Sequence, residues 1–260
     1  MDSGLYAACA GLRAQSQALE VAAHNLANLN TSGFRAQQAT FQSLVAAAPA
    51  GTNGLGGGGN AVLSSARNRA TNIFGVLEGT HMDLTAGNLL ATGNPLDVAI
   101  EGSGFFAVQT AGGTRYTRNG SFQVSSAGQL VTEAGDLVLS DPALKEKGAI
   151  NVPAGAVSIA SDGTLSVNGA VAGTIGLVTF ASSTPLTSEG GSLISAPEGS
   201  ATLTPQPALK QGALESSNVN SIASVVTLIG VQRQAEMLQR ALSLFDSEFD
   251  RIATSDLARV

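Results

Sequence analysis

The spacing of apolar positions predicts a long helix at the N-terminal end of the chain. Over residues 3–29, apolar or small side chains recur three and four residues apart, which is the heptad pattern of one helix face. Asp2 or Ser3 can cap the start of this helix, and the turn-forming residues 28–33 predict its end. The predicted stripe is Leu5, Ala8, Leu12, Gln15, Leu19, Ala22, Leu26 and Leu29.

A second helix with the same spacing is predicted at the C-terminal end. Residues 216–221 offer several capping side chains, and a second apolar face adjoins the main stripe near the helix start. Two narrow apolar seams predict that the two helices pair with each other as a coiled coil, and the alternative is two ordinary core helices. The C-terminal stripe is Leu228, Val231, Ala235, Leu238, Leu242, Phe245, Phe249 and Ile252, and the second face carries Ile222, Val226 and Ile229.

The middle of the chain has the two-residue period of β-strands. Asn119-Gly120 and Asn168-Gly169 separate alternating runs, and Asn-Gly is a strong signal for a hairpin turn. No helical pattern separates the runs, which argues against a parallel sheet. The fold class is therefore α+β, with a central antiparallel domain of hairpins. The predicted strands are 97–100, 105–110, 115–118, 121–124, 129–132, 157–159, 164–167 and 175–180.

These patterns divide the chain into four regions. Residues 1–35 hold the N-terminal helix, 96–210 the β-rich domain and 211–260 the C-terminal helix. Between them, residues 36–95 are predicted to be an extended or flexible connection. Its part 46–72 is rich in alanine and glycine and reads as low-complexity sequence.

The composition indicates a subunit that depends on neighbours. Only 12% of the 260 residues are charged, 4% are aromatic and 31 are glycine, whereas about 25% of residues are charged in a typical soluble domain. Small side chains bury little area each, so a core built from them is thin. The net charge of −6 argues against nucleic acid or an anionic membrane as partner. No run reaches the roughly 18 apolar residues of a membrane span, and no secretory signal is recognisable at the N-terminus.

Few residues are suited to catalysis or metal binding. The one cysteine, Cys9, reads as a small inert hydrophobic residue, and two histidines, His24 and His81, cannot form a His-rich metal site alone. Asp83 lies near His81, but the sequence offers no Gly-x-Ser-x-Gly elbow, so catalysis by either histidine is not favoured. The loop Gly102-Ser103-Gly104 resembles a dinucleotide loop, but it continues as a strand, so we favour a glycine-rich turn. We therefore predict no catalytic residue, no cofactor and no metal. A nucleotide-binding module and a secreted β-rich adhesin remain the alternative classes.

Four stretches resemble the bacterial flagellar rod and hook proteins. Residues 25–35 read Asn-Leu-Ala-Asn-Leu-Asn-Thr-Ser-Gly-Phe-Arg, which is similar to the N-terminal signature of that family. The other three are residues 95–108, 116–122 and 212–220, and all four follow the family's order along nearly the whole chain. Together they are much more specific than any one of them.

The resemblance implies a structural protein and not an enzyme. In this family, the terminal helices form an inner coiled-coil layer, a β domain lies outside it, and subunits stack into a helical tube that transmits torque. The implied partners are other rod and hook subunits, further copies of the chain and the flagellar type III export apparatus, without nucleic acid or direct membrane insertion. The implied location is the periplasm-spanning rod of the basal body, reached without a cleaved signal peptide.

Within the family, the chain resembles the rod proteins more than the longer hook subunit. Residues 94–97 and 107–111 favour the proximal (FlgF) type, whereas residues 104–106 and 231–233 favour the distal (FlgG) type. Gln234-Ala235 stands where the distal type usually carries a tyrosine. We therefore favour the FlgF type, with the FlgG type as the alternative.

The resemblance also assigns candidate assembly residues. The signature is expected to end the helix and send the chain outward, with Phe34 and Arg35 docking on a neighbouring subunit. For Asn25 and Asn28, ordinary capping of the helix end is the alternative. The signature residues are Asn25, Leu26, Asn28, Asn30, Thr31, Gly33, Phe34 and Arg35. The predicted coiled-coil seam is Leu5, Leu12, Leu19, Leu29, Leu228, Val231, Leu238, Leu242, Phe245, Phe249 and Ile252.

Overall fold

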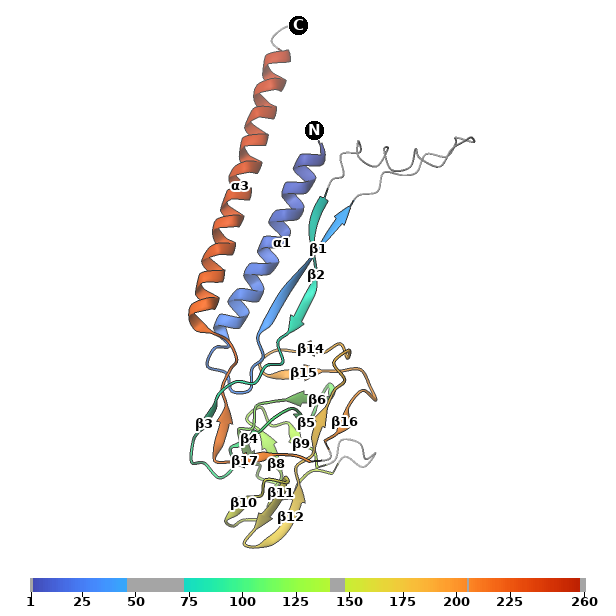
Figure 1. Cartoon of the computed structure of the whole chain (residues 1–260), viewed down its shortest axis with the longest axis vertical. Coiled ribbons are helices and arrows are strands. Elements are labelled where there is room, and N and C mark those ends of the chain that lie inside the picture. Colours follow the sequence, from blue (N-terminus) through green and yellow to red (C-terminus); the bar gives the residue numbers. More distant parts are fainter. Residues whose placement is uncertain (1, 46–72, 141–147, 205, 258–260) are drawn as a thin grey trace, which may run out of the picture. The chain divides into compact units, whose positions relative to one another are not determined.

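The computed structural model describes residues 2–45, 73–140, 148–204 and 206–257 (Figure 1). The chain forms two compact units, each built from separate stretches of sequence. The first comprises residues 1–23, 38–81 and 225–260, and the second comprises residues 24–37 and 82–224. The low-complexity stretch 46–72 lies outside the described residues.

The predicted α+β class is confirmed, with a helix near each end of the chain and antiparallel strands between. The helices are α1 (Asp2–Ala27) and α3 (Ser221–Leu257). The strands up to the middle of the chain are β1 (Gln37–Val45), β2 (Ile73–Met82), β3 (Leu89–Ala91), β4 (Val98–Ile100), β5 (Phe105–Thr110), β6 (Gly113–Thr117), β7 (Phe122–Val124), β8 (Leu130–Thr132) and β9 (Leu137–Val138). The later strands are β10 (Val157–Ile159), β11 (Thr164–Val167), β12 (Ala170–Thr174), β13 (Leu177–Thr179), β14 (Thr187–Ser188), β15 (Leu193–Ser195), β16 (Thr202–Leu203), β17 (Leu209–Gln211) and β18 (Ala213–Glu215).

The first unit contains the two helices and the paired strands β1 and β2. A Cβ on Gly11 of α1 would lie 3.5 Å from Cδ1 of Leu238, so the two helices touch at this point. The strands lie within residues 36–95, where the sequence predicted only an extended connection. Neither described helix is long and apolar enough to cross a bilayer.

The least exposed positions follow the predicted apolar stripe on α3 but only partly on α1. On α3, the half-buried side chains include the predicted positions Leu228, Val231, Ala235, Leu238 and Leu242. On α1, the most buried side chains are Ala14, Ala18 and Ala22, which lie four residues apart. Leu12 and Leu19, the seam leucines of α1 whose side chains are described, are only half-buried. The small side chain of alanine allows a neighbouring segment to approach closely, so the tightest packing among the described residues of α1 follows its alanines.

The second unit is built around a nine-stranded antiparallel sheet. Seven strands follow the order β14-β15-β6-β5-β9-β8-β7, and β13 pairs with both β5 and β16. A separate three-stranded sheet has the order β10-β11-β12. The core joins side chains from both sheets, among them Phe106, Phe122, Leu165 and Ile175. The strands predicted from the two-residue period therefore exist, with ends shifted by a few residues.

The two Asn-Gly pairs have different roles. Asn168 and Gly169 have φ angles of 51° and 84°, and they form the predicted turn between β11 and β12. The hairpin predicted at Asn119-Gly120 is wrong, because β6 pairs with β5 and β15 while β7 pairs with β8. Gly120 instead lies against β4: its carbonyl accepts a hydrogen bond from Val98 N, and a Cβ there would lie 1.7 Å from Val98 O.

The first strands of the second unit, β3 and β4, pair with its last strands, β18 and β17. β3 pairs with β18, opposing Leu90 and Leu214, and β4 pairs with β17, opposing Ala99 and Lys210. This pairing brings the end of β18 close to the signature and sets the position of the candidate site.

Candidate functional site

The signature begins with two asparagines that fasten the end of α1. The Asn25 side chain donates to Gln37 O (2.7 Å) and accepts from Gln37 N (2.8 Å), as a neighbouring strand would. Asn28 Nδ2 donates to His24 O (2.9 Å), and Asn28 Oδ1 accepts from Thr31 Oγ1 (3.1 Å). Asn28 is therefore a helix-end cap, whereas Asn25 ties the helix end to the chain that returns from the turn.

Gly33 lies where the chain presses against the β domain. Its φ of 69° is in the left-handed region, and a Cβ there would lie 2.3 Å from Arg118 C and Asn119 N. Its N–H donates to Glu215 O at 2.8 Å. The position therefore needs glycine both for its conformation and for the close approach of another backbone.

Phe34 and Arg35 lie inside their own chain. Phe34 is 1% exposed and Arg35 is 3% exposed, and the Phe34 ring meets the His24 ring edge-on at 5.4 Å. The expectation that these two side chains dock on a neighbouring subunit is therefore wrong. An aromatic and a basic residue after a turn look alike in sequence whether their partner is another chain or a distant part of the same one.

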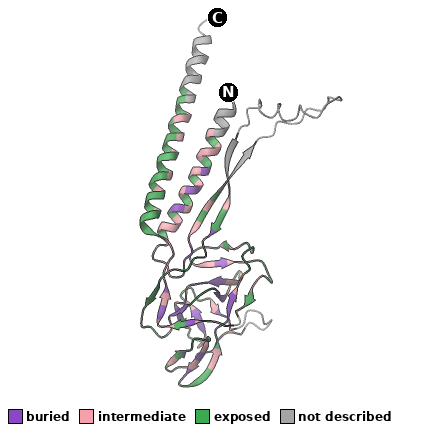
Figure 2. Ribbon diagram, in the orientation of Figure 1, coloured by how far each residue is buried: buried purple, intermediate pink, exposed green. Residues whose placement is uncertain are grey.

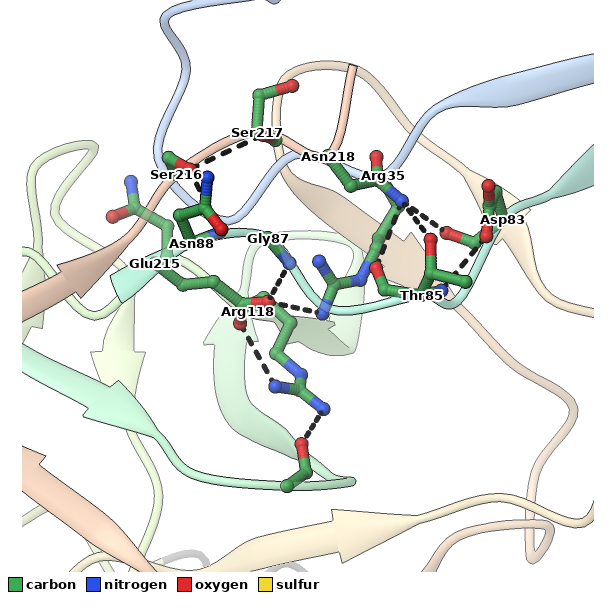
Figure 3. Close-up of polar contacts among 12 residues, drawn as sticks. Arg35, Asp83, Thr85, Gly87, Asn88, Arg118, Glu215, Ser216, Ser217 and Asn218 are labelled. Atoms are coloured by element: carbon green, nitrogen blue, oxygen red, sulfur yellow. Dashed lines mark hydrogen bonds and ion pairs between the residues drawn. The ribbon is translucent and has the colours of Figure 1, made fainter. Parts of the chain in front are cut away.

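Glu215 is the centre of the site and lies between two arginines (Figure 3). Its Oε1 accepts from Arg35 Nη2 and from Gly87 N, each at 2.8 Å, and its Oε2 accepts from Arg118 Nη1 at 3.0 Å. Arg118 Nη2 donates to Gly102 O at 2.7 Å, and this guanidinium lies over the Phe105 ring. The carboxylate thus connects three parts of the chain: the signature, the segment just before β3 and the β domain.

This buried cluster carries two positive charges against one negative charge. Glu215 and Arg118 are 1% and 4% exposed. Burial lowers the pKa of Arg118, the carboxylate of Glu215 opposes that shift, and the charge of Arg35 adds to it. Within the described residues, Arg35 Nε and Nη1 and Arg118 Nε have no hydrogen-bond partner. Loss of Glu215 would leave two buried guanidinium groups without a counter-charge.

Asn218 fastens the outgoing chain next to Glu215. Its Oδ1 accepts from Ala36 N at 2.7 Å, and its Nδ2 donates to Asp83 O and Thr85 O, each at 3.0 Å. One side-chain amide therefore holds the segment after the signature, the segment after β2 and the approach to α3 together. We call Gly33, Phe34, Arg35, Arg118, Glu215 and Asn218 the signature junction.

The other predicted residues are more exposed. Asn30 is exposed, and Leu26, Leu29 and Thr31 are half-buried. Of the seam, Leu12, Leu19, Leu228, Val231, Leu238 and Leu242 are half-buried. The side chains of Leu5, Phe245, Phe249 and Ile252 lie outside the described residues.

No arrangement suited to chemistry is seen in the described part of the chain. The Gly102–Gly104 loop leads into β5 and not into a helix, so it lacks the helix N-terminus that binds a pyrophosphate. Cys9 and His81 are exposed. Among described residues, no three His, Cys, Asp or Glu side chains gather as metal ligands would.

Three family descriptions match separate parts of the chain. "Flagella basal body rod protein" matches residues 5–35, "Flagellar hook protein FlgE/F/G D1 domain" matches 99–167, and "Flagellar basal body rod FlgEFG protein C-terminal" matches 210–254.

Relatives that match this chain along nearly their whole length support the same family. The FlgG rod protein of Bacillus subtilis is 34% identical over 95% of this chain and 96% of its own length. The FlgF rod protein of Caulobacter vibrioides is 32% identical over the whole of both chains, and that of Escherichia coli is 34% identical over 96% and 97%. The chain belongs to the flagellar basal-body rod protein family. FlgF and FlgG relatives are equally similar, so the FlgF type remains a prediction.

The three matched regions of the rod protein family meet at the signature junction. Arg35 is the last residue of the first region, Arg118 lies in the second and Glu215 lies in the third. Each region thus contributes one charge to the buried cluster. The junction is therefore the place where side chains from all three matched regions contact one another.

Sequence reasoning missed the roles of Glu215, Arg118 and Asn218. All three lie in stretches that carry the family resemblance, but no pattern within a stretch shows which side chain meets which. One signal was available: few residues of this chain are charged, and Glu215 follows the apolar residues Ala213 and Leu214. A carboxylate in such a place is often buried and paired.

Proposed function

We propose that this chain is a structural subunit of the flagellar basal-body rod, which assembles with copies of itself and with other rod and hook subunits to transmit torque. Its membership of the rod protein family supports the role. The observation within the structure that carries it is the exposed face of α3, which bears several large apolar side chains.

No described side chain of this 37-residue helix is buried (Figure 2). Beside its half-buried stripe, Ile222, Val226, Met237 and Leu244 are 77%, 64%, 61% and 66% exposed. Most helical stability in proteins comes from packing of an apolar face, and contiguous exposed apolar surface marks an interaction site. A helix of this kind is stable when other subunits cover it.

We further propose that the predicted seam residues of α1 and α3 pair as a coiled coil in the rod. The contact between Gly11 and Leu238 and the half-buried stripe on α3 support this pairing. Heptad seams hold their partners by inserting each apolar side chain between four side chains of the facing helix.

The test replaces the exposed apolar face of α3 without touching its half-buried stripe. The double substitution Val226→Glu and Ile229→Glu should abolish swimming and remove the chain from purified basal bodies, because each carboxylate would be desolvated between subunits. The matched control is Gln232→Glu with Gln239→Glu, which adds the same charge at exposed polar positions of the same helix. Normal incorporation of the Val226 and Ile229 variant would overturn the proposed function.

For the position in the rod, we propose the proximal FlgF type. Complementation separates the two types: the chain should restore swimming to cells without FlgF and not to cells without FlgG. The opposite result would assign it to the distal rod.

We also propose that the chain reaches the rod through the flagellar type III export apparatus without a cleaved signal peptide. The single cysteine excludes a disulfide within the chain, which suits a chain that is exported before it folds. Inactivation of the apparatus should leave the chain in the cytoplasm, and mass spectrometry of rod-assembled chain should find its N-terminus unprocessed.

A further inference from the structure

A cleft that is mainly apolar but includes two acidic residues lies beside the signature turn in the second unit. Its volume is about 270 Å³. The walls come from the turn after α1, the end of β6, the β8–β9 turn and the loop before β15. The polar side chains that line it include Thr31, Thr117, Asn119, Glu133, Asp136 and Ser192.

The charged residues that line the cleft are Glu133 and Asp136, and no basic side chain lines it. Glu133 Oε1 accepts from Ser121 Oγ at 3.0 Å, and Asp136 Oδ2 accepts from Thr132 Oγ1 at 3.5 Å. Neither carboxylate forms an ion pair with a described residue. Two carboxylates with unused acceptor positions among hydroxyl and amide groups suit a guanidinium, which presents five N–H donors and no acceptor.

The chain carries matching arginines on the face of α3 that the proposed function assigns to a neighbouring copy. Arg233 and Arg240 are exposed and seven residues apart, so they lie on one face about 10 Å from each other. Neither forms an ion pair with a described residue. They continue the exposed apolar stripe at intervals of three and four residues, in the order Ile222, Val226, Ile229, Arg233, Met237, Arg240 and Leu244.

We propose that the cleft of one copy binds the Arg233 and Arg240 face of α3 from a second copy of this chain. The inference rests on the proposed function, because it needs copies that lie side by side. The cleft and the arginines are different surfaces of the chain, so the contact is head-to-tail. Such contacts repeat without closing when the rotation does not return to its start, and this produces a helical filament.

Through this contact, a half-buried residue of the signature turn would also take part in assembly. Phe34 and Arg35 are inside the chain, but Thr31 of the same turn lines the cleft. The turn therefore contacts a neighbour through its polar side and packs on its own β domain through its aromatic side.

The test is a charge exchange in the full-length chain, expressed in cells that lack the chromosomal copy. The cleft variant is Glu133→Arg with Asp136→Arg, and the helix variant is Arg233→Glu with Arg240→Glu. Each should lower the amount of chain in purified basal bodies by about tenfold or more, because like charges would face each other at every contact. The combined fourfold variant should recover most of the loss.

The controls are Glu198→Arg and Glu236→Arg, which change single exposed acidic residues outside the cleft and outside the stripe. Both should assemble normally. Far-UV circular dichroism of the purified chains verifies that the cleft and helix variants fold. A cleft variant that assembles normally, or a fourfold variant no better than its parents, would overturn the arginine partner. The Val226 and Ile229 variant tests the proposed function separately.

A disulfide test distinguishes contact between copies from contact within one chain. In a Cys9→Ser background, Ala134→Cys at the cleft and Arg240→Cys on α3 should give disulfide-linked dimers and higher species in assembled rods. Ala134 lines the cleft and is exposed. Oxidised monomer alone, or no disulfide at all in rods that contain the variant, would contradict the proposal.

Discussion

At the scale of single residues, Glu215 stabilises the signature junction because its negative charge balances two arginines that are buried away from water. It accepts hydrogen bonds from two buried arginines and from Gly87 N. We expect Glu215→Ala to lower the free energy of unfolding by about 3–5 kcal/mol, since removing one partner of a buried ion pair leaves the others uncompensated. Urea unfolding followed by circular dichroism measures this loss.

The control for Glu215 is an ion pair on the surface. Glu189 pairs with Arg115, and the Glu189 side chain is 40% exposed. Solvent screens an exposed pair, so Glu189→Ala should change the free energy of unfolding little. Equal effects of the two substitutions would show that the buried cluster has no special role in stability.

Gly33 gives a second prediction at this scale, with Gly93 as its control. Both have positive φ, 69° and 76°, but a Cβ on Gly93 would meet nothing within 4 Å. Gly93→Ala should cost about 1–2 kcal/mol for the left-handed backbone alone. Gly33→Ala should cost clearly more, because the backbone of Arg118 must also move. Thermal unfolding of both variants measures the difference, and an equal cost would refute the close approach.

Part of the site could be predicted from the sequence. Asn28 as a helix-end cap and Gly33 as a turn residue follow from local chemistry that acts within a few residues. The partner of Arg35 could not be predicted, because Glu215 lies 180 residues away and no local spacing connects them. Burial of Phe34 depends on the same distant contacts.

At the scale of elements, α1 packs most tightly along its alanines. Ala18 is buried, whereas Ala23 is exposed on the same helix. Ala18→Leu should destabilise the first unit by about 1–3 kcal/mol through overpacking, and Ala23→Leu should not. Hydrogen exchange across α1 in isolated rods measures the effect. Similar protection in both variants would show that the alanine stripe does not pack as described.

The elements themselves were largely predictable where a local period defines them. The helices and the hairpin at Asn168-Gly169 follow from patterns within a short window. Asn119-Gly120 has the same letters but a different role, because the neighbour that fixes it is β4 and not the next strand. The pairing of β1 with β2 escaped prediction because the low-complexity stretch 46–72 separates the two strands, so no short window contains both.

At the scale of the whole molecule, low charge and small side chains fit a subunit that other copies complete. A charged residue on a surface that becomes buried must lose its hydration, so a chain that is covered on many sides carries few charges. The exposed apolar stripe on α3 is one surface that a neighbouring subunit would cover. The sequence predicted the dependence on neighbours, but only the structure shows which face is free.

The most direct measurement of the central claim is hydrogen exchange of the two helices in the free chain and in isolated rods. In a verified monomer, we expect α1 and α3 to exchange fast while the described strands within residues 96–210 stay protected, because helices without partners do not offset their ordering entropy. In rods, both helices should gain at least a hundredfold protection. Helices that are already fully protected in the monomer and do not change on assembly would contradict the account.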